Sequence, residues 1–374
     1  MNDDTRGQDF LVRRDDLQTT RVADVALPPL GEGQVRLRLD AFGFTANNVT
    51  YAAIGEMMRY WDFFPAPDGW GRVPVWGFAD VAASRHPGVQ VGERIYGYFP
   101  MSTHLDVQAD DVRTDGFTDV TAHRTALPPV YNRYGRAGAD PAYEREREHH
   151  YMLLRPLFAT AFLIDDLLAE REFFGARAIA LSSASSKTAI GLAALLSGRA
   201  PRSYTVVALT SRANAGFVEG LGYYDRIVTY DALDAGLSPD DPLVFVDMAG
   251  NGAVRDAVHR RLGDHLKYSC SVGLTHHDRM AMPAGDLPGP SPEFFFAPDR
   301  MVQRTRDWGP AGFQERVGGA LKRFVRDAER WLGIQHAAGP DAVERVYRAT
   351  LAGEADPAVG YVLSLANPSK EGAA

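Results

Sequence analysis

Hydrophobic and polar positions follow two different patterns along the chain. Residues 10–130 contain short apolar runs that glycine and proline interrupt, such as QVRLRLDAFGF, VPVWGFADVAAS and GERIYGYFP. This pattern is typical of short strands joined by tight turns. We therefore expect a β-rich domain over residues 1–150, in which the charged stretch 132–150 is a solvated loop leading into a helix.

From Tyr151 onwards, helical and strand patterns alternate. The segment LLRPLFATAFLIDDLLAE has apolar residues at helical spacing. Helical segments then separate five continuous apolar runs, which are RAIAL, YTVVALT, RIVTY, LVFVDM and LKYSCSV. Strands without polar alternation are buried on both faces, as in a parallel sheet covered by helices. The pattern predicts a doubly wound α/β domain over residues 151–339.

The C-terminal region returns to amphipathic helices and one short strand. A proline-rich, aromatic segment over 281–301 precedes a predicted helix over 312–333. A further helix is expected over 341–353, and the run 358–367 reads as a last strand.

Composition narrows the class of protein. The 374 residues are 45% hydrophobic and carry a formal net charge of −8, which argues against nucleic acid or an anionic membrane as the main partner. No apolar run reaches about 18 residues, and the polar N-terminal segment is not that of a signal peptide. A single cysteine, Cys270, excludes a disulfide framework. We expect a cytoplasmic enzyme with two domains.

A strand, a turn and a helix are predicted over 180–196, ALSSASSKTAIGLAALL, and this order suits phosphate binding at a helix start. The usual G-x-G-x-x-G of a dinucleotide site is missing. Lys187 and Thr188 resemble the end of a P-loop, but Leu181 and Ser186 occupy its two glycine positions. A serine-rich N-cap that binds no ligand is the third interpretation.

The residues that follow the second apolar strand help to decide between these three interpretations. In dinucleotide-binding folds, an acidic residue there binds the ribose hydroxyls of NAD. Here Ser211 and Arg212 follow the strand, and a hydroxyl with a guanidinium suits a 2′-phosphate. The pattern favours an NADP site, while P-loop chemistry and a ligand-free fold stay open.

The chain as a whole resembles the medium-chain dehydrogenase/reductase superfamily, in particular its zinc-free quinone-oxidoreductase and enoyl-reductase branch. The similar segments occur in the family's order over most of the chain, and they include GEGQVRLRLDAFGFTANNVTYAAIG, VPVWGFADVAASRHPGVQVGERIYGYFP, RAIALSSASSKTAIGLAALL and ALTSRANAGFVEGLGYYDRIVTYD.

The resemblance implies a GroES-like β-rich catalytic domain over 1–150, completed by about 340–374, and a Rossmann NADP-binding domain over 151–339. It also implies a small-molecule substrate and a homodimer. The sequence departs from the zinc-using branch because its first domain contains no cysteine, so we expect no catalytic metal. The phosphate-binding glycines of the family are also replaced.

Site residues follow from the turn, the strand ends and the resemblance. Tyr51 and Tyr60 are candidate proton donors and Asn48 a candidate for orienting the substrate or the cofactor, although buried tyrosines with paired hydroxyls are common in any β-domain. The predicted cofactor-binding residues are Ser185, Ser186, Lys187, Thr188, Ser211, Arg212, Tyr230, Gly250, Gly273 and Thr275. Asp247 reads as a structural carboxylate at a strand end.

These features together predict a zinc-independent, NADPH-dependent reductase of an activated C=C bond in a small apolar substrate of enone, quinone or enoyl type. Two alternatives stay open. The first is a catalytically silent nucleotide- or ligand-binding protein on the same scaffold, and the second is a carbonyl or imine reductase.

Overall fold

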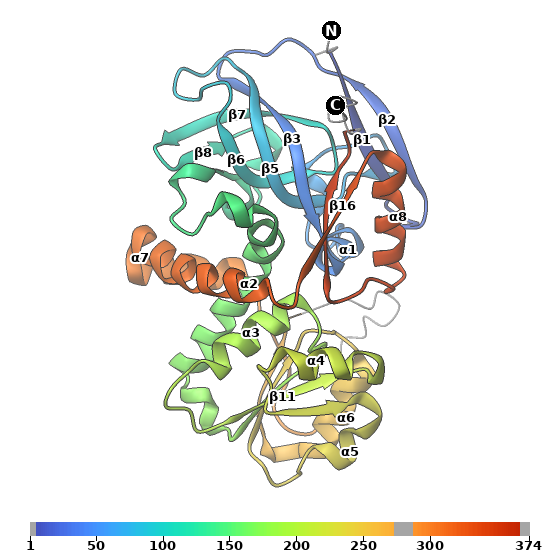
Figure 1. Ribbon diagram of the computed structural model, residues 1–374, viewed down its shortest axis with the longest axis vertical. Coiled ribbons are helices and arrows are strands. Elements are labelled where there is room, and N and C mark those ends of the chain that lie inside the picture. Colours follow the sequence, from blue (N-terminus) through green and yellow to red (C-terminus); the bar gives the residue numbers. More distant parts are fainter. Residues whose placement is uncertain (1–4, 273–286, 367–374) are drawn as a thin grey trace. The chain divides into compact units, whose positions relative to one another are not determined.

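The computed structural model describes residues 5–272 and 287–366. The chain divides into two compact units, which Figure 1 colours along the sequence. Unit 1 comprises Met1–Leu153 and Leu332–Ala374, and unit 2 comprises Leu154–Trp331.

Unit 1 contains two sheets, whose strands pair antiparallel except for the parallel pair β16 and β17. A three-stranded sheet has the order β2-β1-β4, and an eight-stranded sheet has the order β16-β17-β3-β5-β6-β9-β8-β7. The strands are β1 (Arg6–Arg13), β2 (Thr20–Ala26), β3 (Gln34–Phe44), β4 (Trp70–Gly71), β5 (Pro74–Ser84), β6 (Arg94–Pro100), β7 (His104–Arg113), β8 (Gly116–Asp119), β9 (Arg133–Arg136), β16 (Gly333–Ala338) and β17 (Val359–Ser364). The helices are α1 (Ala46–Ala53) and α8 (Pro340–Leu351), and α2 (Glu148–Glu170) begins here.

The long strand β3 closes the larger sheet into a barrel. Along one edge of β3, residues 34–38 pair with β7 and residues 42–44 pair with β17. Along the other edge, β3 pairs with β5. The pairing with β5 shifts register between Leu39 and Ala41. A Cβ at Gly77 of β5 would lie 2.4 Å from the Ala41 carbonyl oxygen, so the close approach at this shift requires glycine.

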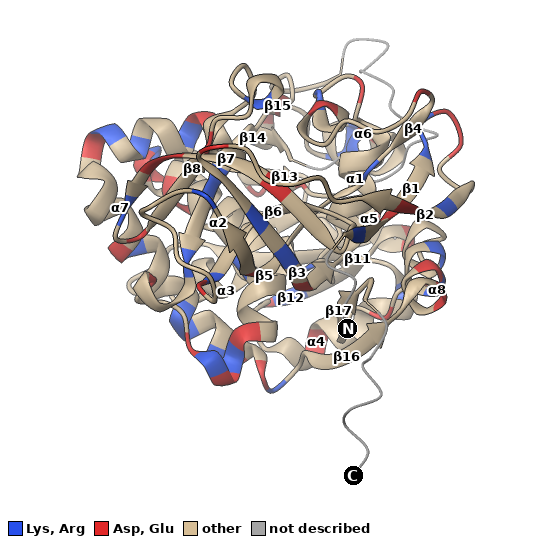
Figure 2. Ribbon diagram, turned by 90° about the horizontal axis from the view of Figure 1, so that it is seen from above, with Lys and Arg blue, Asp and Glu red and all other residues tan. Residues whose placement is uncertain are grey.

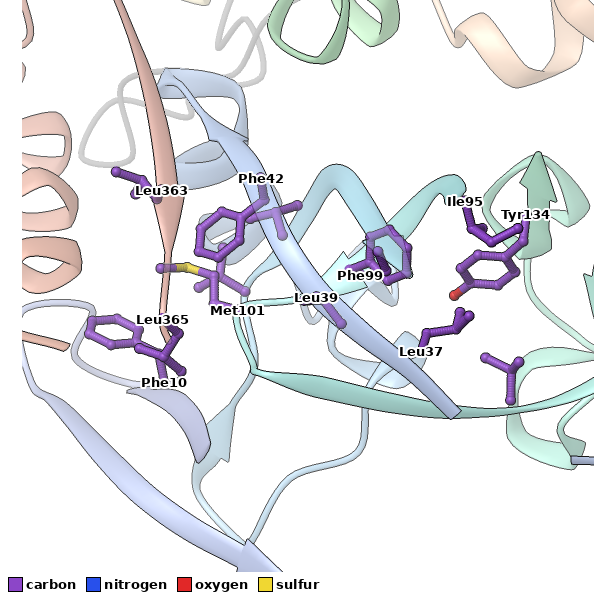
Figure 3. Close-up of a cluster of buried hydrophobic side chains, with 14 of the residues drawn as sticks. Phe10, Leu37, Leu39, Phe42, Ile95, Phe99, Met101, Tyr134, Leu363 and Leu365 are labelled. Atoms are coloured by element: carbon purple, nitrogen blue, oxygen red, sulfur yellow. The ribbon is translucent and has the colours of Figure 1, made fainter. Parts of the chain in front are cut away.

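The barrel interior is an apolar core built from alternate strand positions. Figure 3 shows its side chains meeting from β3, β6, β9 and β17. Its largest contributors include Leu37, Leu39, Phe42, Ile95, Phe99, Tyr134 and Leu363, all 5% exposed or less. The predicted β-rich N-terminal domain is therefore confirmed, and its sheet includes two strands from the end of the chain.

Unit 2 is built on a parallel sheet with the order β12-β11-β10-β13-β14-β15. The strands are β10 (Ala178–Leu181), β11 (Thr205–Thr210), β12 (Arg226–Thr229), β13 (Leu243–Asp247), β14 (Leu266–Ser271) and β15 (Glu293–Phe294). The helices are α3 (Lys187–Ser197), α4 (Ala215–Leu221), α5 (Leu233–Gly236), α6 (Gly252–Leu262) and α7 (Ala297–Ala328). Every residue of β10 and β13 is buried, as the continuous apolar runs predicted. The strand order is that of the doubly wound dinucleotide-binding fold, so the predicted fold class is confirmed.

Helix α7 starts earlier than its hydrophobic pattern predicts. It begins at Ala297 and contains a kink at Gly309, where φ is +73°. Charged residues of both signs lie along it, as the colours of its ribbon in Figure 2 show. Arg300 and Arg304 both pair with Asp166 of α2, at 2.6 Å. Ion pairs with α2 hold this first segment together with apolar contacts of Ala297 and Met301. Too few of its positions are apolar for a hydrophobic periodicity to reveal the helix.

Candidate functional site

The structure brings several predicted cofactor segments to one edge of the parallel sheet. Residues 182–186 follow β10, Ser211 and Arg212 follow β11, Tyr230 follows β12, and Gly250 lies just beyond β13. The strand order reverses between β10 and β13. Ligands of open α/β sheets bind at the carboxyl ends of the strands beside such a reversal. Gly273 and Thr275, which were also predicted, lie outside the described residues.

The turn after β10 adopts a glycine-like conformation without glycine. Ser183 has φ +48°, in the left-handed region that costs most residues about 1 kcal/mol or more. Its backbone N–H donates to the Tyr230 hydroxyl at 2.8 Å, and the Ala184 N–H donates to the Leu209 carbonyl at 3.2 Å. Contacts from β11 and from Tyr230 thus hold a turn that related folds obtain with glycine.

The predicted hydroxyl ligands lie at the start of α3, and they also serve the local structure. Ser186 is the N-cap, and its Oγ accepts from the Ala189 N–H at 3.3 Å. The Ser185 Oγ accepts from Asn214 Nδ2 at 3.0 Å. Because each hydroxyl accepts in these bonds, its own hydrogen can still be donated to an anion.

Lys187 and Thr188 open α3, and both are half-buried. The first turn of a helix presents backbone N–H groups that lack a helical acceptor, together with a partial positive charge. The donor set therefore fits a phosphate group. The cofactor roles of these residues stay predictions.

Ser211 and Arg212 lie at the end of β11, as the motif requires. The Ser211 Oγ caps the following short helix by accepting from the Asn214 N–H at 3.3 Å. Arg212 is 83% exposed and forms an ion pair with Asp231, a residue that the sequence reasoning missed. Asp231 directly follows Tyr230, so its place at a neighbouring strand end could have pointed to it.

Asp247 organises the turn after β13 from a buried position. Its Oδ1 accepts from the Ser182 hydroxyl at 2.7 Å, from the Gly250 N–H at 3.0 Å and from the Ala249 N–H at 3.1 Å. Burial raises the pKa of Asp247, while these hydrogen bonds and the charge of Arg255 lower it. The contacts are those of a structural carboxylate, and Gly250, with φ +63°, completes the turn.

In unit 1, the two predicted tyrosines lie together in an aromatic cluster. Tyr51 of α1 and Tyr60 of a short 3₁₀ helix have ring centroids 4.6 Å apart. The Tyr51 hydroxyl accepts from Trp76 Nε1 at 3.5 Å, and the Tyr60 hydroxyl lies 3.3 Å from that of Tyr131. Tyr98 packs edge-on against Tyr51 at 5.7 Å.

Trp76, Tyr98 and Tyr131 were not among the predicted site residues. Trp76 and Tyr98 lie on β5 and β6, strands that the pattern did predict. A run such as RIYGYFP shows that tyrosines alternate with other residues on a strand, but it does not show what they face. Only the pairing of β5 with β6 brings Trp76 directly opposite Tyr98.

Burial raises the pKa of all four phenols. Desolvation of the phenolate is the largest cause for Tyr51, and hydrogen bonds from Trp76 and Asn47 partly oppose it. Desolvation also dominates for Tyr60, Tyr98 and Tyr131. These side chains are therefore neutral hydrogen-bond donors at neutral pH.

Asn48 lies near this cluster in the sequence, but its side chain serves the helix. Its Oδ1 accepts from the Thr45 N–H at 2.9 Å in a capping box, and its Nδ2 donates to the Pro74 carbonyl at 3.0 Å. The structure thus gives it the task of fixing α1 to β5. A role of Asn48 in orienting the substrate or the cofactor stays a prediction.

Within residues 5–272 and 287–366, every helix is too short or too polar to span a membrane. Over the same residues, no group of three or more histidine, cysteine, aspartate and glutamate side chains is arranged to hold a metal ion.

The model of a known family matches most of the chain. It spans residues 42–356 and is described as a protein of unknown function, DUF2855. The chain belongs to the DUF2855 family. No curated protein matches this DUF2855 chain.

Solved structures resemble the DUF2855 chain over nearly its whole length. CurA of Vibrio vulnificus in complex with NADPH is 11% identical, with a TM-score of 0.64, covering 96% of this chain and 100% of that one. A mutant enoyl thioester reductase of Candida tropicalis is 9% identical, with a TM-score of 0.56 and coverage of 96% and 99%. An oxidoreductase of Salmonella enterica in complex with NADP is 16% identical, with a TM-score of 0.51 and coverage of 95% and 99%. These likenesses confirm the medium-chain dehydrogenase/reductase fold that the resemblance implied.

Proposed function

We propose that this protein is an NADPH-dependent, zinc-independent oxidoreductase that reduces an activated C=C bond in a small apolar substrate. The observation that carries the proposal is the meeting of the segments after β10, β11, β12 and β13 at one edge of a sheet with the dinucleotide-binding strand order. Solved structures of the same fold contain NADPH or NADP.

The residues at this edge fit the parts of NADP. Ser185, Ser186 and Lys187 at the start of α3 would hold the pyrophosphate through hydroxyl donors, helix N–H groups and a positive charge. Ser211 and Arg212 would bind the 2′-phosphate. When bound, NADPH supplies the hydride.

In unit 1, the Tyr51 phenol would stabilise the oxygen that gains charge as the conjugated substrate is reduced. Because its hydroxyl accepts from Trp76, its hydrogen remains available for donation. Burial keeps it protonated at neutral pH. A neutral donor aimed at a developing oxyanion is the usual means of such stabilisation.

A silent binding protein on the same scaffold is the second candidate. The hydrogen bond from the Ser183 N–H to the Tyr230 hydroxyl favours this candidate. This N–H would be a natural ligand of a pyrophosphate, but it already has an acceptor within the protein. NADPH oxidation assayed with enones, quinones and enoyl thioesters separates the two candidates. NADPH binding without turnover of any of these substrates would support the silent protein.

Thermal unfolding with NADPH, NADP and NADH tests the cofactor assignment. A ligand at about 100 times its dissociation constant adds roughly 2.7 kcal/mol to the free energy of unfolding. We expect a shift with NADPH and NADP. No shift with any nucleotide would overturn the reductase proposal, and a shift with NADH alone would refute the roles of Ser211 and Arg212.

The homodimer is also a proposal, and the outermost strand of the sheet in unit 2 supports it. Strand β15 is the last strand in that sheet, and Phe294 on it is 54% exposed and stacks on Phe296. Light scattering should give twice the monomer mass, and Phe294→Asp should reduce it to that of a monomer. A parent protein of monomer mass would refute the dimer.

A further inference from the structure

Asn214 lies where the chain passes from β11 towards α4, and its side chain contacts a different segment. It occupies the N-cap of α4, but its side chain makes no hydrogen bond to that helix. Asparagine at an N-cap ordinarily accepts from the N–H groups of the helix that follows. Here the Asn214 Nδ2 donates instead to the Ser185 Oγ at 3.0 Å, in the turn after β10. The side chain therefore serves the turn rather than its own helix.

The main chain of this turn is held by other residues. The Ala184 N–H donates to the Leu209 carbonyl at 3.2 Å, and the Ala184 carbonyl accepts from the Tyr224 hydroxyl at 2.8 Å. The bond from Asn214 reaches only the hydroxyl of Ser185. What Asn214 fixes is thus the direction of a hydroxyl and not the path of the backbone.

The Ser185 hydroxyl keeps a hydrogen that it can donate. Its oxygen accepts from Asn214, and none of the residues that the structure describes accepts from it. By contrast, Ser197 at the far end of α3 donates its hydrogen to the Ala194 carbonyl at 3.3 Å. Ser185 is half-buried, so part of the residue stays exposed at the carboxyl edge of the sheet. An acceptor on a ligand at this edge would complete its hydrogen bonds.

Asn214 is itself fixed at the end of β11. Its backbone N–H donates to the Ser211 carbonyl at 3.1 Å and to the Ser211 Oγ at 3.3 Å. Ser185 follows β10 and Ser211 follows β11, and these strands are parallel neighbours in the sheet. Asn214 therefore connects the segment predicted to bind the pyrophosphate with the segment predicted to bind the 2′-phosphate.

We propose that Asn214 is a positioning residue for the cofactor, which orients the Ser185 hydroxyl so that it donates its hydrogen to the pyrophosphate of NADPH. This inference rests on the proposed cofactor site and adds to it a residue that acts through another. A hydroxyl oriented in advance loses less freedom when the ligand binds, and a hydrogen bond to a charged acceptor is stronger than one between neutral groups.

A double-mutant cycle with Asn214→Ala and Ser185→Ala tests whether the first residue acts through the second. Isothermal titration measures the dissociation constant of NADPH for the parent protein, the two single variants and the double variant. Ser185→Ala should weaken NADPH binding about tenfold, and Asn214→Ala about threefold. The double variant should bind no more weakly than Ser185→Ala alone, because Asn214 then has no hydroxyl to orient.

Asn214→Asp changes the direction of the hydrogen bond with little change of shape. A carboxylate only accepts, so it would take the Ser185 hydrogen that the pyrophosphate needs, and its charge would repel the phosphates. We expect this variant to bind NADPH about thirtyfold more weakly than the parent protein, a larger loss than that of Asn214→Ala.

Ser197→Ala is the matched control, because it removes a half-buried serine hydroxyl from the other end of the same helix. It should leave the NADPH affinity unchanged. Thermal unfolding of the free proteins supplies the second readout. Asn214→Ala should lower the Tm no more than Ser197→Ala does, since Leu209 and Tyr224 still hold the main chain of the turn.

Contrary results identify what is wrong. Additive losses in the cycle would mean that Asn214 acts independently of Ser185, and unchanged affinity in Asn214→Ala or Asn214→Asp would mean that it has no role in binding. A much larger fall in Tm for Asn214→Ala than for Ser197→Ala would show that the residue supports the turn itself. Each of these outcomes refutes the inference. Failure of the proposed function is recognised separately, because the parent protein itself then binds no NADPH.

Discussion

Tyr230 has two possible roles, which are to contact the 2′-phosphate of the cofactor or to hold the turn after β10 through a hydrogen bond. Sequence reasoning places Tyr230 near the 2′-phosphate of the cofactor. In the structure its hydroxyl accepts the Ser183 N–H at 2.8 Å and so holds the turn after β10 itself. Tyr230→Phe removes the acceptor and keeps the ring.

The expected loss in the free energy of unfolding depends on how the Ser183 N–H is satisfied once the Tyr230 hydroxyl is removed. A backbone hydrogen bond contributes about 1 kcal/mol net, and a partly buried N–H that loses its acceptor costs up to about 3 kcal/mol. Ser183 is half-buried and already in the left-handed region, so the turn can relax once it is released. We therefore expect Tyr230→Phe to lower the free energy of unfolding by about 1–2 kcal/mol.

Cofactor binding then separates the two roles. A clamp on the turn positions the pyrophosphate, which NADPH and NADH share, so the affinities for both should fall by about the same factor. Isothermal titration with each nucleotide measures this, beside urea unfolding of the free protein. Tyr204→Phe is the matched control, because its hydroxyl bonds the Leu196 carbonyl at 3.2 Å at the far end of α3. It should cost similar stability and leave cofactor affinity unchanged.

A selective loss of NADPH affinity in Tyr230→Phe would show that the tyrosine contacts the 2′-phosphate and would refute the clamp. Unchanged stability and unchanged affinity would show that the Ser183 hydrogen bond has no consequence for the turn.

Three further predictions concern charges at the same edge of the sheet. Lys187→Ala should weaken NADPH binding in a titration, and an unchanged affinity would mean that the lysine only begins a helix. Asp231→Asn should tighten NADPH binding about threefold and leave NADH unaffected, because it frees Arg212 from a competing carboxylate; Asp225→Asn, at the other end of β12, is the control. Burial raises the folded-state pKa of Asp247 above its unfolded value, so its carboxylate opposes folding increasingly as the pH rises from about 4. The stability of Asp247→Asn relative to the parent should therefore increase with pH, by at most about 1.4 kcal/mol per unit, and a pH-independent difference in urea unfolding would contradict this.

Much of the fold could be predicted because its elements carry local signals. Continuous apolar runs such as β10 and β13 indicate a buried parallel sheet, and alternation with helices indicates the doubly wound order. The first segment of α7 escaped prediction because ion pairs of Arg300 and Arg304 with a distant helix help to hold it, with few apolar contacts. Such pairs leave no periodic trace in the sequence.

For the candidate site, the motif positions could be predicted but the partners could not. The turn after β10 and the residues after β11 follow from spacing along the chain. That Tyr230 meets Ser183, and that Asp231 meets Arg212, depends on the pairing of parallel strands whose ends lie 19 to 47 residues apart.

The amino-acid sequence by itself determined the classes of element, the position of the turn after β10 and the absence of glycine from that turn, since each depends on neighbours along the chain. Tertiary structure alone decided how that turn is held in a glycine-like conformation, and which rings surround the Tyr98 hydroxyl. The physical reason is that hydrogen bonds and ring contacts act over a few ångströms in space. Only the folded sheet brings residues such as Trp76, Tyr98 and Tyr131 within that range.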